Sequence, residues 1–449
     1  MTKDDVLEQA ALHDLRLVRF LYCDYGSIIR GKATHTKHLA SRMDEGIGLV
    51  RGMMVMNGLD QLQSDPEMTA VGEVRIVPDP GSFAILPYAP GVGSMMSDFK
   101  LLDRAPWPAC PRTFLRRVLD GAAARGIRIE AAFENEFFLL REVDGGFVPA
   151  DRSLCFSSVG MDSAAAFTDD LIAALDGQGI QPEQAMPEYG AGQQEISTRH
   201  GPALRAADNQ LRVRDTARAI ATRHGLIASF APKPFPDQIG SGAHIHLSLW
   251  DSGTGANLLY DPNAQYCLSE AGRQFVAGVL DHLPALVALT CPSVNSYRRL
   301  QPQAWASAFV CWGYDNREAA VRVPSNYWGR EQGTTNVELK TVDNSCNPYL
   351  ALGGMIVAGL DGIARKLDPG PSLDVDPSLL SDAERERRGY RRFPGTLPEA
   401  LDNLQSDCAL TGAMGEMMAR GYQTVRRSEA AAYAAQPEAF EFAQHMAKY

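Results

Sequence analysis

The sequence of 449 residues lacks any run of about 18 uninterrupted apolar residues, the length that a helix needs to cross a bilayer. Its start, MTKDDVLEQAALHDLRL, is charged and has no basic region followed by an apolar one, as a secretory leader would have. We therefore expect a soluble cytoplasmic protein that does not bind a membrane.

Paired cysteines and basic tracts are also absent. The eight cysteines, from Cys23 to Cys408, form no CxxC motif, so reduced thiols are expected. The formal net charge is −11, and no stretch of Lys and Arg is dense enough to follow a phosphate backbone. Nucleic acid is therefore a poor candidate partner, and an acidic protein that handles nucleotides would need metal ions and local arginines.

Two common nucleotide-binding motifs are missing. The sequence has no GxxxxGK[ST] motif, which excludes a P-loop enzyme, and no GxGxxG motif opens a helix. Any nucleotide site must be built from other residues.

What the sequence does contain predicts two domains, because 45% hydrophobic content over this length supports a large core. Residues 14–32 predict a strand, a turn at Tyr25 and Gly26, and a second strand, which is typical of a small β-rich domain. A proline-punctuated stretch follows. We place the boundary near residue 108, which gives domains 1–108 and 109–449.

The second domain begins with helical spacing over residues 112–125, followed by the long strand IRIEAAFENEFFLL. Helix and strand signals then mix without strict alternation. This pattern predicts an α+β fold around an antiparallel sheet, with a helical tail over residues 397–449.

Carboxylates with unusual spacing follow. Glu134 and Glu136 are two residues apart on the long strand and share one face, which costs free energy unless a cation neutralises them. The alternative is a solvent-exposed strand face. Glu188 and Glu195 bracket the Gly- and Gln-rich segment PEYGAGQQEIS, which by itself is weak evidence for a ligand site.

A pair of histidines adds to this set. In IGSGAHIHLSLW, His244 and His246 are two apart on a predicted strand and share a face, and Glu338 lies on a short β-branched run. A lone buried histidine is more often structural, but a same-face pair among unpaired carboxylates favours ligands. Five carboxylates and one imidazole suit Mg²⁺ or Mn²⁺ better than Zn²⁺, and two ions could be held: Glu134, Glu136, Glu188, Glu195, His244 and Glu338.

Four arginines lie between the histidines and Glu338 in a segment rich in Trp and Tyr: Arg298, Arg299, Arg317 and Arg322. Arginines among apolar residues are costly to bury unless they meet carboxylate or phosphate. Arg298 could instead form a surface ion pair. Metal ions together with the other three arginines predict phosphoryl transfer.

These segments, in this order and across nearly the whole chain, resemble the glutamine synthetase family. ENEFF is similar to its ExE strand, EYGAGQQE to its second carboxylate pair, and KPFPDQIGSGAHIHLSL to its KPxxGxxGSGxHxHxSL segment. NSYRRL with DNREAAVRVP resembles its arginine segment, and VELKTVDNSCNPYLAL its closing strand.

The resemblance implies a β-grasp-like N-terminal domain, a larger catalytic domain, and a homo-oligomer of stacked rings, a dodecamer, with active sites between neighbours. It implies attack of the glutamate γ-carboxylate on ATP to form γ-glutamyl phosphate, which an amine opens to an amide. The roles implied are one metal at Glu136, Glu188 and Glu195, a second metal at Glu134, His244 and Glu338, ATP at His246, Ser248 and Arg322, glutamate at Gly240, Arg299 and Lys340, and the γ-phosphoryl group at Arg317 and Arg322.

The chain departs from the family at the ammonium pocket. Trp305 stands where a PGYEAP-like loop would carry Glu, and the N-terminal stretch RGMMVMNG contains no DGSS-like Asp. Trp305, together with the methionines Met53, Met54 and Met56, would form an apolar amine pocket instead; the alternative is that the methionines simply fill the N-terminal core. A hydrophobic, weakly basic amine that is already neutral at pH 7 would need no carboxylate to remove a proton before attack. An aromatic amine such as aniline, or a small alkylamine, fits better than a polyamine, whose second charge would need an acidic partner.

Two further departures concern the acid. Ile239 replaces an Asn, and Lys340 replaces an Arg, which keeps the charge but loses the bidentate fork. Glutamate remains the expected acid. Ordinary glutamine synthetase, a γ-glutamylpolyamine synthetase, a ligase or kinase for another acid, and a non-catalytic structural protein are the alternatives. The family's NLY adenylylation sequence is absent around residues 378–393, so we expect no such control.

Overall fold

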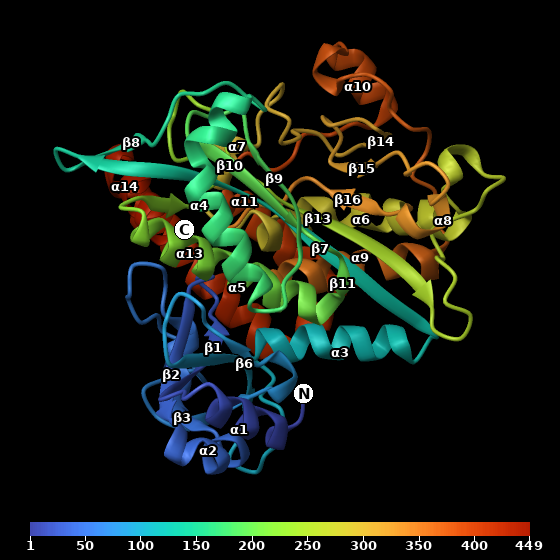
Figure 1. The fold of residues 1–449 in the computed structure, drawn as a ribbon. Coiled ribbons are helices and arrows are strands. Elements are labelled where there is room, and N and C mark those ends of the chain that lie inside the picture. The colour runs from blue at the N-terminus through green and yellow to red at the C-terminus, as the bar shows by residue number, and fades with distance from the viewer.

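The computed structural model describes residues 1–449 and shows a small sheet at one end of the molecule and a large sheet with most of the helices around it (Figure 1). The small sheet has six strands in the order β2-β1-β6-β4-β3, with β5 paired to β6. Its elements are α1 (Lys3–Leu12), β1 (Leu17–Cys23), β2 (Ile29–His35), α2 (Leu39–Glu45), β3 (Ile47–Val50), β4 (Glu73–Pro78), β5 (Ala84–Ile85) and β6 (Val92–Lys100).

The large sheet has ten strands in the order β14-β15-β16-β13-β7-β10-β9, with β8, β11 and β12 also paired to β7. Its pairs are antiparallel except β14 with β15. The strands are β7 (Ile127–Val143), β8 (Gly146–Pro149), β9 (Pro182–Pro187), β10 (Gln193–Thr198), β11 (Gly201–Pro202), β12 (Ile227–Ser229), β13 (Ala243–Asp251), β14 (Trp312–Tyr314), β15 (Val321–Val323) and β16 (Val337–Leu339).

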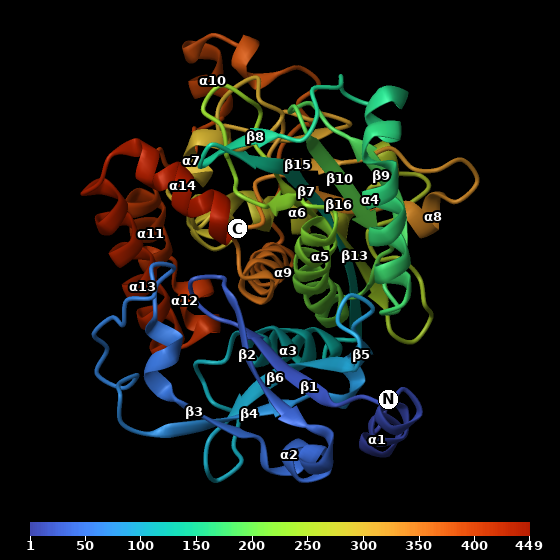
Figure 2. The ribbon, with the colours of Figure 1, turned by 60° about the vertical axis from the view of Figure 1, so that its left-hand side comes forward.

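Helices surround this sheet, and the turned view shows α5 and α9 between it and the small sheet (Figure 2). They are α3 (Pro111–Ala123), α4 (Ser158–Asp176), α5 (Ala203–Arg223), α6 (Glu270–Thr290), α7 (Ser296–Arg299), α8 (Glu331–Thr334), α9 (Pro348–Arg365), α10 (Asp382–Arg388), α11 (Leu397–Ser406), α12 (Cys408–Met414), α13 (Glu416–Ala434) and α14 (Glu438–Lys448). None of these helices combines the length and the apolar character that spanning a membrane requires.

Local sequence explains the central elements. Along β7, Phe133, Asn135 and Phe137 are buried on one face, whereas Glu134 and Glu136 are half-buried on the other. The α9 helix begins where the Asn347 side chain accepts hydrogen bonds from backbone N–H groups of the first turn, with proline at the first helical position.

The two sheets are joined by buried polar contacts. Arg112, at the start of α3, is buried and forms ion pairs with Asp98 at 3.1 Å and with Asp208 of α5 at 2.8 Å. At the other end of the chain, the Tyr449 hydroxyl donates to the carbonyl of Gly26 at 2.8 Å. The C-terminal residue thus contacts the turn between β1 and β2.

The expected elements are present. The strand–turn–strand over residues 14–32 is confirmed, since β1 and β2 pair antiparallel from Leu17 opposite His35 to Cys23 opposite Ile29. The long strand, the antiparallel α+β character and the helical tail are confirmed as well. The boundary near residue 108 stays a proposal; it falls between the end of β6 and the start of α3.

Candidate active site

A cavity of about 440 Å³ opens beside the central strands of the large sheet. Side chains from β7, β9, β10, β13 and β15 line it together with two loops, around residues 239–240 and 303–306. Most of the residues that the sequence selected lie here: Glu134, Glu136, Glu188, Glu195, Gly240, His244, Arg299, Trp305, Arg317, Arg322 and Lys340.

Strand register brings the acidic residues together. In the antiparallel pairing, Glu195 of β10 lies opposite Glu136 of β7, and His244 of β13 lies opposite Glu134. On the other edge of β13, His246 lies opposite Glu338. Because directly opposed residues point to the same face of a sheet, their side chains gather at one place.

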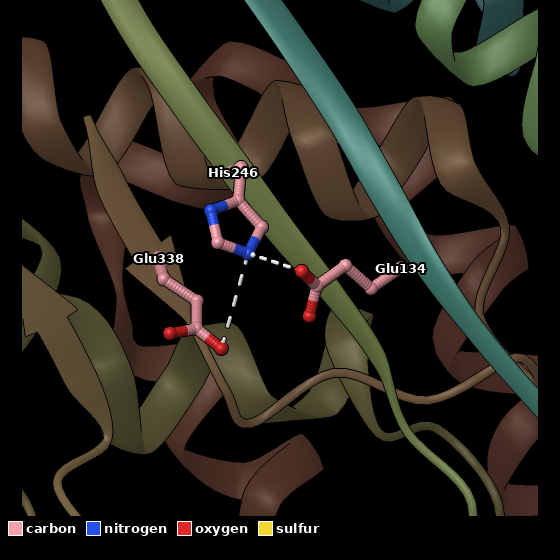
Figure 3. A group of neighbouring side chains, drawn as sticks. All are labelled: Glu134, His246 and Glu338. Carbon is pink, nitrogen blue, oxygen red and sulfur yellow. Dashed lines mark ion pairs between the residues drawn. The ribbon is translucent and has the colours of Figure 1, made fainter. Parts of the chain in front are cut away.

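The two histidines both reach the carboxylates. His244 Nδ1 lies 3.4 Å from Glu134 and 3.5 Å from Glu338. His246 Nε2 lies 3.2 Å from Glu134 and 4.0 Å from Glu338, and Figure 3 shows its ring pointing between the two carboxylates. Ligand atoms of Glu134, His246 and Glu338 lie within 4.8 Å of one another, a spacing that suits a metal ion.

This grouping differs from the predicted roles, which gave His244 to the metal and His246 to the nucleotide. Both imidazoles are on the same face of β13, so both are within reach of Glu134 and Glu338. The Asn336 side chain lies 2.8 Å from His246 Nδ1 and leaves Nε2 facing the carboxylates.

Electrostatics favour a cation at the acidic end. Burial and the charge of Glu134 raise the pKa of Glu195 to about 9, and burial and the charge of Glu136 raise the pKa of Glu188 to about 7. Glu136 is held in place by the Gly242 N–H, which donates to it at 2.8 Å. Crowded, buried carboxylates of this kind are stabilised by bound divalent ions.

The basic side of the cluster has the opposite effect. Burial disfavours the charged form of Glu338, but the Lys340 ammonium and the two histidines outweigh it and lower the pKa of Glu338 to about 2. Burial alone would lower the pKa of His246, whereas the charge of Glu134 raises it to about 9. Against the effect of burial, the histidines also lower the pKa of Glu134. Glu134 and Glu338 therefore both stay ionised and able to bind a cation.

The predicted donor set therefore suits divalent ions, since carboxylate oxygens dominate and imidazole completes the set. The division between Glu136, Glu188 and Glu195 on one side, and Glu134, Glu338 and a histidine on the other, stays a prediction.

The arginines fall into two environments. Arg299 is buried, its Nη2 donates to the Lys340 carbonyl at 3.2 Å, and its Nη1 has no partner in the protein. Arg322 pairs with Glu338 at 2.9 Å, and the exposed Arg317 lies at the cavity wall. Arg298 does not line the cavity; it forms ion pairs with the buried Glu441 and the exposed Glu438, in agreement with the ion-pair alternative that the sequence left open.

Close packing explains why residue 240, beside Arg299, is a glycine. A Cβ on Gly240 would lie 2.5 Å from the Pro232 carbonyl oxygen and 2.7 Å from Arg299 Cγ, so only glycine fits beside this arginine. Lys340 is buried, and its Nζ lies 3.4 Å from Glu338. Ile239 lines the same cavity.

Trp305 lies at the cavity wall, 47% exposed, with its ring edge-on to Tyr189 at 5.3 Å between centroids. The three methionines do not line the cavity of this chain: Met54 is fully buried in the core, and Met53 is packed against it. Ser248 also lies outside the lining, where its hydroxyl accepts from Trp250 Nε1 at 2.9 Å. Trp305 is thus the amine-pocket candidate that the structure places at the cavity.

The site also contains residues that the sequence did not single out, among them Phe156, Tyr189, Glu318 and Asn336. Tyr189 directly follows Glu188, and Glu318 lies between two selected arginines, so both were adjacent to a signal. Asn336 directly precedes β16, two residues before Glu338, so it was adjacent to a signal as well. Phe156 carries no sequence signal, since a loop brings it to the cavity.

A cavity lined by crowded carboxylates, with arginines beside them, suits phosphoryl-group chemistry. Comparison with known proteins identifies the class. Residues 1–107 match the glutamine synthetase N-terminal domain, and residues 108–445 match the glutamine synthetase catalytic domain.

Relatives agree along the whole chain. A γ-glutamylpolyamine synthetase, GlnA3, of Streptomyces coelicolor is 39% identical over 91% of this chain and 88% of its own length. The glutamine synthetase of Methanosarcina mazei is 32% identical over 99% and 98%, respectively. Among solved structures, a novel glutamine synthase homolog has a TM-score of 0.87 at 34% identity, covering 97% of this chain and 99% of that one. A GmaS–ADP complex has a TM-score of 0.85 at 28% identity, covering 97% and 98%.

The chain therefore belongs to the glutamine synthetase family and has its fold. Members of this family are ATP-dependent ligases that form carbon–nitrogen bonds, and they normally use divalent metal ions.

Proposed function

We propose that this chain joins the γ-carboxylate of glutamate to an amine other than ammonium, at the expense of ATP. A γ-carboxylate oxygen attacks the γ-phosphorus of ATP and ADP leaves, which gives γ-glutamyl phosphate. The amine nitrogen then attacks the acyl carbon, inorganic phosphate leaves, and the nitrogen loses a proton to give the amide. Divalent ions, when bound, would neutralise the phosphate oxygens in the first step.

The side chains have matching roles in this proposal. Arg299 binds the α-carboxylate of glutamate through its unpaired Nη1, in a pocket closed by Gly240 and Lys340. Arg317 and Arg322 stabilise the transferred phosphoryl group, and His246 and Ser248 face the nucleotide. The acidic residues hold the metal ions: Glu134, Glu136, Glu188, Glu195 and Glu338, with His244.

The observation that supports a non-ammonium amine is the aromatic wall of the cavity. Trp305, Tyr189 and Phe156 all line it. Aromatic rings contribute apolar contact area but no carboxylate to attract and deprotonate ammonium. An aromatic amine such as aniline, which is neutral at pH 7, or a small alkylamine, whose apolar group would contact the rings, suits this wall, and either substrate would be typical of the γ-glutamyl-amine subgroup of the family.

One alternative amine has support of its own. The relative of Streptomyces coelicolor, at 39% identity, is a γ-glutamylpolyamine synthetase. Aromatic faces also bind ammonium groups by cation–π attraction, so a polyamine could use the same wall.

For the assembly, we expect this chain to form the homo-oligomeric rings of the family.

The test is a panel of separate reactions. The purified protein receives ATP, Mg²⁺ and glutamate with ammonium, ethylamine, isopropylamine, putrescine or aniline, and both phosphate release and amide formation are measured. We expect an apolar amine to exceed ammonium and putrescine in kcat/KM. Preference for putrescine would favour the polyamine ligase, preference for ammonium would identify an ordinary glutamine synthetase, and no amide with any amine would favour another acid or a non-catalytic role.

The same panel on Trp305→Ala tests the aromatic wall. We expect the KM of the preferred amine to rise about tenfold, because a ring that contacts the amine contributes on the order of 1–2 kcal/mol. Trp328→Ala is the matched control, since Trp328 is 99% exposed and does not line the cavity. Equal effects of the two substitutions would contradict the assignment.

A further inference from the structure

The loop over residues 302–307 has a backbone that needs support. Gln303, Trp305 and Ser307 have φ angles of 59°, 51° and 67°, in the left-handed region that non-glycine residues seldom adopt. Three such residues in one short loop raise its free energy unless neighbouring groups hold it. Four residues of this loop, 303–306, line the cavity, so its position shapes the cavity wall.

Glu318 makes the contact that holds the loop. Its carboxylate Oε1 accepts a hydrogen bond from the backbone N–H of Trp305 at 2.9 Å. Glu318 lies in the segment between β14 and β15, next to Arg317, and its own N–H donates to the Asn316 side chain at 3.0 Å. The contact therefore joins the loop to the edge of the large sheet.

The environment of Glu318 is unusual for a carboxylate. It is 8% exposed, and no Lys, Arg or His forms an ion pair with it. Burial raises the pKa of the Glu318 carboxyl, whereas the Trp305 N–H favours its charged form. A buried carboxylate without a cationic partner lowers stability unless its hydrogen bonds are satisfied, so the loop N–H is a contact that this side chain needs.

We propose that Glu318 is a positioning residue that fixes the 302–307 loop, and with it the Trp305 ring, over the amine end of the cavity. This inference rests on the proposed function for its consequence, which is amine selection. With the loop in place, Trp305 contacts Tyr189 and the amine is bound against an ordered aromatic wall. With the loop released, water reaches the acyl phosphate and competes with the amine.

The loop itself can be tested without activity. Hydrogen exchange measured by mass spectrometry on a peptide that covers residues 302–307 compares the wild type with Glu318→Ala and Glu318→Gln. We expect exchange at least tenfold faster in Glu318→Ala and within threefold of the wild type in Glu318→Gln, because an amide oxygen still accepts from Trp305. The matched control is Glu399→Ala. The Glu399 carboxylate also accepts a hydrogen bond from a backbone N–H, that of Gly395, at a donor–acceptor distance of 2.7 Å, but neither residue lines the cavity. Unchanged protection in Glu318→Ala would overturn the inference.

Kinetics test the consequence for the amine. Glu318→Ala should raise the KM of the preferred amine at least tenfold while the KM values of ATP and glutamate change less than threefold. It should also release more phosphate than amide, and Glu318→Gln should restore both. A uniform rise of all three KM values, or an unchanged amine KM, would overturn the inference. If the wild type makes no amide with any amine, the proposed function fails, whereas the exchange result still decides whether Glu318 holds the loop.

Discussion

The Arg299 guanidinium is buried, yet its Nη1 atom has no hydrogen-bond partner in the protein. Leaving a buried charged donor unpaired lowers stability by several kcal/mol in general, so such groups commonly face a ligand. Nearby Gly240 leaves room for the arginine stem. The unpartnered Nη1 of Arg299 is thus the strongest indication of where an acid binds.

Arg299→Lys should weaken glutamate binding. Lysine keeps the charge but loses the fork that pairs with a carboxylate, so we expect glutamate KM to rise about 30-fold, equivalent to about 2 kcal/mol. Steady-state kinetics with glutamate as the varied substrate measure this. Arg298→Lys is the matched control, because the neighbouring Arg298 pairs with Glu441 instead, and it should change KM less than threefold. A similar KM change in both variants would contradict the role of Arg299.

Glu195→Gln should separate metal binding from folding. Because burial and the charges of Glu134 and Glu136 raise the pKa of Glu195 to about 9, folding of the metal-free protein at pH 7 requires this carboxyl group to take up a proton. Glutamine is always neutral and avoids that cost, so the apparent Tm of the metal-free protein should rise by a few degrees. The rise of Tm on adding Mg²⁺ or Mn²⁺ to chelator-treated protein should become much smaller. Thermal-shift assays with the exposed Glu183→Gln as control measure both effects. A full metal-dependent shift in Glu195→Gln would show that this carboxylate is not a ligand.

At the scale of elements, one histidine joins three helices. His282 of α6 lies 2.6 Å from Asp407, which caps α12, and 3.1 Å from Asp361 of α9. Hydrogen bonds to Asp407, opposed in part by burial, raise the pKa of His282 to about 9. The protonated form therefore stabilises the packing of these helices.

A pH-dependent stability follows. A folded-state pKa above the unfolded value gives stability that is complete below about pH 6.5 and is lost as the pH rises through about 9. We expect His282→Gln to cost about 1–2 kcal/mol at pH 6 and much less at pH 10, measured by denaturant unfolding across that range. His224→Gln is the control, because the His224 pair with Asp170 is exposed. A pH-independent difference would refute the ion-pair explanation.

Elements with strong periodicity could be predicted from the sequence. The alternation along β7 fixed the common face of Glu134 and Glu136, and the same reasoning placed His244 and His246 together. Register between strands could not be predicted, because it depends on pairing over long sequence separations. The position of His246 beside Glu338, which brings both histidines within reach of the same carboxylates, depends on that register.

At the scale of the whole molecule, the paths of the loops determine which residues outside the strands line the cavity, and the sequence does not predict those paths. Phe156 and Trp305 reach the cavity from segments without regular structure, so no period predicts them. For the methionines the sequence left two possibilities open, an amine pocket or the N-terminal core: Met54 is in the core, and the cavity lining of this chain contains none of the three. In rings of subunits, the N-terminal sheet of a neighbour would be placed beside the cavity, and the role of Met53 and Met56 stays a prediction for that assembly.

The account as a whole depends on glutamate being activated through its γ-carboxylate and then captured by an amine in the same cavity. Glutamate labelled with ¹⁸O in both γ-carboxylate oxygens, supplied with ATP, Mg²⁺ and equal concentrations of isopropylamine and ammonium, tests both steps at once by mass spectrometry of the phosphate and of the amide. The account predicts one ¹⁸O atom in each phosphate released with amide, and more γ-glutamyl isopropylamide than glutamine. Unlabelled phosphate would contradict acyl-phosphate formation, and glutamine as the main product would contradict the altered amine pocket.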